Sequence, residues 1–230
     1  MKKLKLIKRV VVIDDDDTQA EITCELIQEA GYKPEIFHNG TRDIVGIVAH
    51  VKTSADAAVC DHRLAERWAV PFNGAQLAAS LMETGIPALL VSQYLKVDID
   101  VSIRKWRSAL PIVLRRNEAS PDRIRTGLEE CSRELAGKVS PRRRSRRALI
   151  RVVAVGPGTG EAVVDCFIPQ WKPDVAVRFP LSQVPTDIQD QVQPQARLLA
   201  NVNIGAADSD ELFVENIELA PPIDEDDGLA

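Results

Sequence analysis

Short apolar runs alternate with amphipathic stretches over the first 135 residues of the chain. Val10–Ile13 is a β-branched run suited to a buried strand, and Thr18–Ala30 has helical spacing that stops at Gly31. The same alternation predicts four further strands, at Lys33–Phe37, Ala55–Cys60, Pro87–Ser92 and Ala109–Leu114, and three further helices, at Thr41–Val51, Gly74–Thr84 and Pro121–Leu135. This order predicts an α/β domain, a doubly wound (βα)5 parallel sheet covered on both faces.

The pattern changes after a basic stretch, SPRRRSRR, at Ser140–Arg147. Ile150–Val155 and Ala162–Ile168 flank a GPGTG segment, which indicates a hairpin. Three more strands are expected, at Asp174–Phe179, Arg197–Ile204 and Leu212–Ile217, with a short helix at Pro185–Gln191. Several short strands separated by turns favour a small β-barrel or sandwich.

These patterns divide the chain into four parts. Residues 1–138 form the α/β domain, 139–147 a solvated basic linker, 148–220 a small β-rich, barrel-like domain, and 221–230 an acidic, mobile tail. No internal repeat relates the two halves.

Composition narrows the classes of protein that fit. The 230 residues are 45% hydrophobic and carry a net charge of −5, so a core can form and the charge does not by itself indicate nucleic-acid binding. The four cysteines form no CxxC or Cys/His cluster, which argues against thiolate metal ligation. The apolar run at Val10–Ile13 is too short for a signal or membrane segment. We therefore expect a cytoplasmic protein with no membrane partner.

Polar side chains collect where the predicted strands end. Asp14 and Asp15 follow the first strand, Asp61 the third, and Ser92 ends the fourth. In an open parallel sheet, sites form beyond the carboxyl ends of the strands. One of the aspartates in the run Asp14–Asp17 is expected to cap the following helix, but capping does not explain all four. A hard cation such as Mg²⁺ prefers carboxylate oxygens.

The first domain resembles the receiver domain of bacterial two-component response regulators over Lys8–Leu135. The segments that carry the resemblance are VVVIDDDD, GYKPEIFHNG, AAVCDHRL, and the stretch from FNGAQLAASL through IPALLVSQY. The resemblance implies that Asp14 and Asp15 bind Mg²⁺ together with the phosphoacceptor Asp61, and that Ser92 is the hydroxyl residue of the fourth strand. The intervals of 46 residues (61 − 15) and 31 residues (92 − 61) suit this order.

The chain departs from the family pattern in three places. Where the family has a lysine followed by proline, Arg116 is the best match and Arg115 the second. An arginine there either clamps a phosphoryl group or holds Asp61 in an ion pair. The aromatic residue usual in the fifth strand is absent. The loop after Asp61 is longer than usual and contains Trp68, which is expected to cover the pocket or to contact a partner.

These features predict a non-enzymatic response regulator. It would accept a phosphoryl group on Asp61 from a histidine kinase and signal through the β-rich domain by contact with a downstream protein. A DNA-binding regulator that uses Arg142–Arg147 is an alternative, since Lys/Arg runs also contact nucleic acid. A degenerate receiver that acts as a constitutive scaffold is a third. The sequence identifies neither the kinase nor the family of the second domain.

Overall fold

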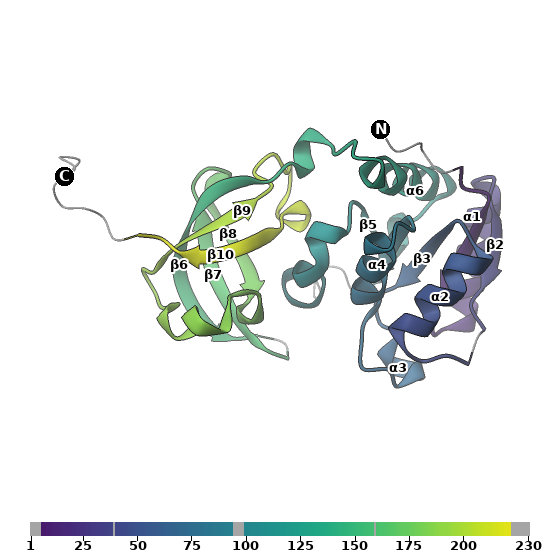
Figure 1. Ribbon diagram of the computed structural model, residues 1–230, viewed down its shortest axis with the longest axis horizontal. Helices are drawn as coiled ribbons and strands as arrows, with labels where there is room; N and C mark the ends of the chain where they lie inside the picture. Colours follow the sequence, from purple (N-terminus) through teal and green to yellow (C-terminus); the bar gives the residue numbers. More distant parts are fainter. Residues whose placement is uncertain (1–5, 39, 94–98, 159, 222–230) are drawn as a thin grey trace. The chain divides into compact units, whose positions relative to one another are not determined.

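The computed structural model describes residues 6–38, 40–93, 99–158 and 160–221. The chain forms two compact units, Met1–Ser140 and Pro141–Ala230, and each has its own sheet (Figure 1). Most of the predicted acidic tail lies outside the described residues. No helix within the described ranges is long and apolar enough to cross a membrane.

The first unit is built on a five-stranded parallel sheet with the order β2-β1-β3-β4-β5. The strands are β1 (Arg9–Ile13), β2 (Lys33–Ile36), β3 (Ala57–Asp61), β4 (Ala88–Ser92) and β5 (Val113–Arg115). This order is that of the flavodoxin-like, doubly wound fold. The predicted (βα)5 architecture is confirmed.

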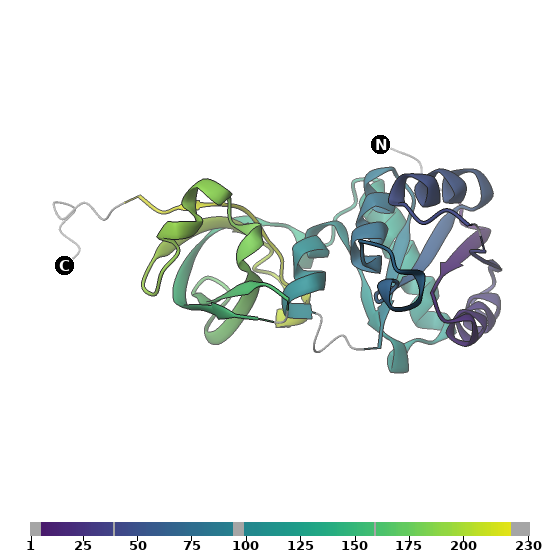
Figure 2. The ribbon, with the colours of Figure 1, turned by 90° about the horizontal axis from the view of Figure 1, so that it is seen from below.

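Side chains that alternate along β1 explain why helices cover both faces of this sheet. Val11 and Ile13 belong to one buried cluster, whereas Val10 and Val12 belong to another. The first cluster includes residues of α2 (Ile44–Ser54) and α4 (Gly74–Glu83), and the second includes residues of α1 (Asp17–Glu29) and α6 (Pro121–Leu135). Figure 2 shows the sheet between these layers. Short turns complete the unit: α3 (Ala65–Trp68), the π-helix η1 (Ile99–Ile103) and the 3-10 helices η2 (Arg104–Ala109) and η3 (Arg116–Glu118).

Two predicted boundaries in this unit are corrected by local hydrogen bonds. The helix expected at Thr41–Val51 begins at Ile44, because Oδ1 of Asp43 accepts a hydrogen bond from the backbone N–H of Gly46 at 2.8 Å and caps it. The strand expected at Ala109–Leu114 begins at Val113, because Ala109 is the last residue of η2 and the chain bends at Pro111 before the strand starts.

The second unit is an antiparallel sheet with the order β10-β9-β6-β7-β8. Its strands are β6 (Arg146–Pro157), β7 (Ala162–Ile168), β8 (Lys172–Pro180), β9 (Arg197–Val202) and β10 (Val214–Leu219). The hairpin predicted around GPGTG is confirmed, since β6 pairs with β7. β6 pairs with β9 along its first half, from Arg146 to Arg151, and with β7 along its second half, from Arg151 to Pro157. A bulge between Val152 and Ala154 lies near the point where the partner strand changes.

The second unit, expected to be a small β-barrel or sandwich, is an antiparallel sheet that does not close into a barrel within the described residues. Among the described residues, the edge strands β8 and β10 do not pair with each other. The chain between β8 and β9 instead forms two 3-10 turns, η5 (Leu181–Gln183) and η6 (Thr186–Gln191). Val184 and Val192 of this segment are buried in the core of the unit, and Nε2 of Gln183 donates to the backbone carbonyl of Val214 at 3.2 Å. The segment that contains these turns therefore covers the core of the second unit, and a barrel would instead need β8 to pair with β10.

The predicted linker at 139–147 also needs correction, because its second half is part of the β-rich unit. Arg146 and Arg147 lie in β6 and pair with Val202 and Asn201 of β9. The side chain of Asn203 donates to the carbonyl of Arg142 at 3.1 Å, which fastens the short 3-10 turn η4 (Pro141–Arg143) to the same unit. The unit therefore starts at Pro141, not at residue 148.

Candidate functional site

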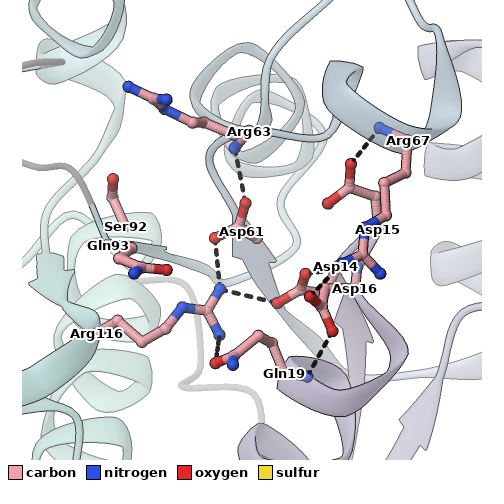
Figure 3. Close-up of a pocket in the computed structure, with 10 residues that line it drawn as sticks. All are labelled: Asp14, Asp15, Asp16, Gln19, Asp61, Arg63, Arg67, Ser92, Gln93 and Arg116. Atoms are coloured by element: carbon pink, nitrogen blue, oxygen red, sulfur yellow. Dashed lines mark hydrogen bonds and ion pairs between the residues drawn. The ribbon is translucent and has the colours of Figure 1, made fainter.

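A polar pocket of about 200 Å³ lies at the carboxyl ends of β1, β3 and β4 (Figure 3). It is lined by Asp14, Asp15, Asp16, Gln19, Asp61, Arg63, Arg67, Ser92, Gln93 and Arg116. All five residues predicted for the site, Asp14, Asp15, Asp61, Ser92 and Arg116, are among them. The pocket lies where an open parallel sheet of this topology binds ligands.

Three carboxylates form the acidic core of the pocket. Asp14 and Asp15 follow β1 and Asp61 ends β3, and each offers an oxygen within 4.8 Å of the other two. Burial, together with the charge of Asp61, raises the pKa of Asp14 above its ordinary value. Burial also raises the pKa of Asp15, and Asp61 adds to that rise while the Arg67 N–H opposes it. Burial and the nearby charge of Asp61 therefore disfavour the ionised forms of Asp14 and Asp15.

Backbone N–H groups hold each of these carboxylates in place. Asp14 accepts from the N–H of Asp16 at 3.0 Å, Asp15 from that of Arg67 at 2.7 Å, and Asp61 from that of Arg63 at 2.7 Å. Such contacts fix the orientation of a carboxylate and favour its charged form.

The cap of α1 is Asp16, which confirms that one of the four aspartates caps this helix. Oδ1 of Asp16 accepts hydrogen bonds from the backbone N–H groups of Thr18 at 3.0 Å and Gln19 at 3.2 Å. Asp17 is the first residue of the helix and is exposed. Its charge suits the positive end of the helix dipole.

Arg116 connects the two most enclosed carboxylates. Its Nη2 donates to Oδ2 of Asp14 at 2.8 Å and also to Oδ1 of Asp61. Its Nη1 donates to Oε1 of Gln19 at 3.3 Å. Burial opposes the charged guanidinium, but Asp14 and Asp61 together outweigh it and raise the pKa of Arg116. Of the two arginines considered for this role, the structure places Arg116 in the pocket lining and Arg115 outside it.

Ser92 lies at the end of β4 with its hydroxyl facing the same pocket (Figure 3). The residue is 1% exposed, and within the described part of the chain its Oγ has no hydrogen-bond partner. A buried hydroxyl without a partner is costly unless a ligand or water satisfies it. A water molecule or an oxygen atom of a bound group would satisfy this hydroxyl.

Close packing at the end of β3 fixes the position of Asp61. A Cβ at Gly74 would lie 1.6 Å from the carbonyl oxygen of Asp61, so only glycine fits there. The N–H of Gly74 also donates to the carbonyl of His62 at 2.8 Å. On the other side, the ring Nε2 of His62 lies 2.8 Å from Oγ of Ser102. The backbone around Asp61 is therefore clamped between α4 and η1.

Outside the aspartate run, sequence reasoning missed four residues of the pocket, Gln19, Arg63, Arg67 and Gln93. Arg67 is anchored at both ends, since its N–H contacts Asp15 and its guanidinium pairs with Asp16 at 2.7 Å. The signal for it was present as a basic residue in the long loop after Asp61. Trp68, which was expected to cover the pocket or to contact a partner, is not among the lining residues. It packs against Phe37 at 5.9 Å between ring centroids and under the guanidinium of Arg42 at 4.5 Å.

The residues present fit a divalent cation by type and by charge. Three carboxylates within reach of one another supply the oxygen ligands that Mg²⁺ prefers. Asp14, Asp15 and Asp61 are the residues that would hold the ion.

Comparison with solved structures finds chains of low sequence identity that cover 58% of this chain. A response regulator receiver domain from Clostridium thermocellum is 12% identical, with a TM-score of 0.44, over 58% of this chain and 100% of that one. The N-terminal domain of a response regulator/sensory box/GGDEF protein from Carboxydothermus hydrogenoformans is 19% identical, with a TM-score of 0.43 and the same coverage. A CheY-like receiver domain protein from Methanospirillum hungatei is 17% identical, with a TM-score of 0.42. No family model and no curated protein matches the sequence.

Proposed function

We propose that the first unit is a receiver module that accepts a phosphoryl group on Asp61 from a phosphohistidine of a partner kinase. The observation that carries the proposal is the pocket itself. It joins a carboxylate at the end of β3 to two further carboxylates, a guanidinium and a buried hydroxyl with no partner in the described residues. A nucleophile, a cation site and donors for anionic oxygens are the groups that phosphoryl transfer requires.

The transfer is a direct displacement at phosphorus. A carboxylate oxygen of Asp61 forms the new O–P bond while the P–N bond to the donor histidine breaks. The electron pair of that bond goes to the imidazole nitrogen, which takes up a proton. No oxidant or reductant is needed.

The residues around Asp61 have distinct tasks in this scheme. Arg116 offsets the negative charge of Asp61 and of the incoming group. The hydroxyl of Ser92 donates to a phosphoryl oxygen and so gains the partner that it lacks. A Mg²⁺ ion held by Asp14, Asp15 and Asp61 would supply further charge neutralisation between the carboxylates and the phosphoryl oxygens.

Phosphorylation by acetyl phosphate in Mg²⁺ tests this proposal with a matched control. The full chain should be labelled and the Asp61→Asn variant should not. Asp56 lies five residues earlier, where its carboxylate accepts hydrogen bonds from the backbone N–H groups of Lys8 and Arg9, outside the pocket. Asp56→Asn should therefore be labelled like the wild type. Equal labelling of Asp61→Asn and wild type would remove Asp61 as the acceptor.

One observation favours a second function, a constitutive scaffold that is not phosphorylated. Arg116 already neutralises Asp61 in the ion pair seen here, so the pocket is partly satisfied without a ligand. This alternative predicts that the wild-type chain takes no label from acetyl phosphate or from a histidine kinase. It also predicts that the wild type and the Asp61→Asn variant bind the downstream protein with equal affinity.

For the second unit we propose signalling by contact with a protein rather than with DNA. Part of the basic run is already engaged within the unit. Arg147 pairs with Glu218, and the guanidinium of Arg143 lies 5.1 Å from the ring centroid of Phe213. DNA binding that weakens steeply with salt would favour the nucleic-acid alternative. Co-purification of the full chain with a protein that stays bound at high salt would support protein contact.

A further inference from the structure

We propose that Arg116 is a built-in competitor of the divalent cation, because its guanidinium takes the carboxylate oxygens that the ion requires. Arg116 must leave the place between Oδ2 of Asp14 and Oδ1 of Asp61 before a cation can bridge these two oxygens. The inference rests on the proposed function of the pocket and adds a control on metal binding to it.

The competition follows from how the oxygens of two carboxylates are used. Nη2 of Arg116 contacts Oδ2 of Asp14 and Oδ1 of Asp61 at once. The other oxygen of Asp14 accepts from the N–H of Asp16, and the other oxygen of Asp61 accepts from the N–H of Arg63. Both carboxylates therefore have both oxygens engaged. A Mg²⁺ ion that bridged Oδ2 of Asp14 and Oδ1 of Asp61 would need the place between these two oxygens that Nη2 of Arg116 occupies.

The guanidinium is the group that can move. The backbone N–H groups belong to the segments that follow β1 and β3, whereas Arg116 reaches the acids from η3 by a long side chain. Its Nη1 also contacts Gln19, which is not one of the three carboxylates. Gln19 gives Arg116 an acceptor within the pocket that does not depend on the acidic cluster.

Partial burial makes this contact strong enough to matter. The side chain of Arg116 is 17% exposed, and those of Asp14 and Asp61 are 4% and 11% exposed. Pairs on the open surface contribute little because water screens them, but charge-assisted hydrogen bonds in an enclosed site are stronger. Cation binding at this pocket should therefore be weaker than its three carboxylates alone would give.

Two substitutions at Arg116 distinguish two ways in which its side chain can weaken cation binding. One is contact with the carboxylate oxygens, and the other is repulsion between its positive charge and that of the cation. Arg116→Lys keeps the positive charge but has one terminal nitrogen in place of two, so it cannot hold Gln19 with one nitrogen while the other bridges both acids. Arg116→Gln removes the charge. Arg115→Lys is the matched control, because Arg115 lies outside the pocket and pairs with Glu118 at 3.9 Å.

The experiment is a calorimetric titration of the full chain and its variants with MgCl₂. We expect both Arg116 variants to bind Mg²⁺ more tightly, Arg116→Gln by roughly tenfold or more, which is about 1.4 kcal/mol. Arg115→Lys should bind like the wild type. Unchanged affinity in Arg116→Lys, with or without a gain in Arg116→Gln, would overturn the inference.

A second measurement uses the unsubstituted chain and so does not depend on how the variants fold. The guanidinium NMR signal of Arg116, assigned by its loss in Arg116→Lys, should shift as Mg²⁺ saturates the site. An unchanged signal at saturation would also overturn the inference.

Phosphorylation by acetyl phosphate, measured on the same samples, keeps the two proposals apart. If the wild type is labelled on Asp61 but Arg116→Lys binds Mg²⁺ no more tightly, the competition fails and the proposed function stands. If Arg116→Lys binds Mg²⁺ more tightly but no sample is labelled, phosphoryl transfer fails and the competition stands.

Discussion

Each of the four consecutive aspartates that follow β1 lies in a different environment. Asp14 is buried and paired with Arg116, Asp15 is held by the N–H of Arg67, Asp16 caps α1, and Asp17 is exposed. Only Asp14 and Asp15 belong to the acidic cluster with Asp61. Substitutions of these neighbours should therefore have separable effects.

Asp15→Asn should stabilise the protein in EDTA and remove most of its stabilisation by Mg²⁺. The amide oxygen can still accept from the N–H of Arg67, while the repulsion from Asp61 is lost. We expect a gain on the order of 0.5–1 kcal/mol, seen as a rise of a few degrees in melting temperature. A lower melting temperature in EDTA would contradict the account.

The gain from Asp15→Asn should also shrink as the pH falls. The folded-state pKa of Asp15 is raised, so between that pKa and the ordinary value of 3.8 the folded state binds more protons than the unfolded state. The amount by which ionised Asp15 lowers the stability of the wild type therefore decreases as the pH falls through this window. Melting curves of both proteins in EDTA from pH 7 to pH 4 test this, and a constant difference would argue against it.

Gly74→Ala should destabilise the first unit and displace Asp61. The added Cβ would lie 1.6 Å from the backbone carbonyl of Asp61, so the strand end or α4 must move. Overpacking of this kind costs about 1–3 kcal/mol or more. Gly156→Ala is a control, because a Cβ there meets nothing within 4 Å. Equal melting temperatures for Gly74→Ala and wild type would refute the close packing.

At the scale of elements, the sheet, the hairpin and the acids at the strand ends were predictable because their signals are local. The apolar runs of β1, β3 and β4 and the GPGTG turn each lie within a few residues. By contrast, α3 has four residues, too few to show a helical period. The contact of Arg116 with Asp61 spans 55 residues, so no local pattern indicates it, and the resemblance gave it only as one of two alternatives.

The errors in the second unit have the same origin. Arg146 and Arg147 appeared to belong to a linker because of their charge, but pairing with Val202 and Asn201 draws them into β6. Whether β8 and β10 form hydrogen bonds with each other depends on the path of the turns between β8 and β9. No short sequence pattern predicts that path.

The start of α1 gives a prediction at this scale. Asp16→Ala removes the acceptor for two backbone N–H groups and the ion pair with Arg67, and should cost about 1 kcal/mol. Asp16→Asn keeps the capping oxygen and should cost less. Unfolding in urea measures both, and equal losses would mean that the charge rather than the cap matters.

At the scale of the whole molecule, the boundary between Ser140 and Pro141 predicts that 1–140 and 141–230 each fold alone. A fragment 148–230 should be less stable than 141–230 by roughly 1–3 kcal/mol, because it lacks the pairing of Arg146 and Arg147 with β9 and the contact of Asn203 with Arg142. Thermal unfolding compares the two, and equal stability would place the boundary after the basic run.

The most direct test of the central claim is to locate the phosphoryl group on the chain. Borohydride converts an aspartyl phosphate into homoserine, and trypsin releases the peptide Thr53–Arg63, which contains both Asp56 and Asp61. After treatment with acetyl phosphate and Mg²⁺, fragment masses should place homoserine at position 61 and unmodified aspartate at position 56. Modification at another position, or an unmodified Asp61 after treatment with both acetyl phosphate and a histidine kinase, would contradict the account.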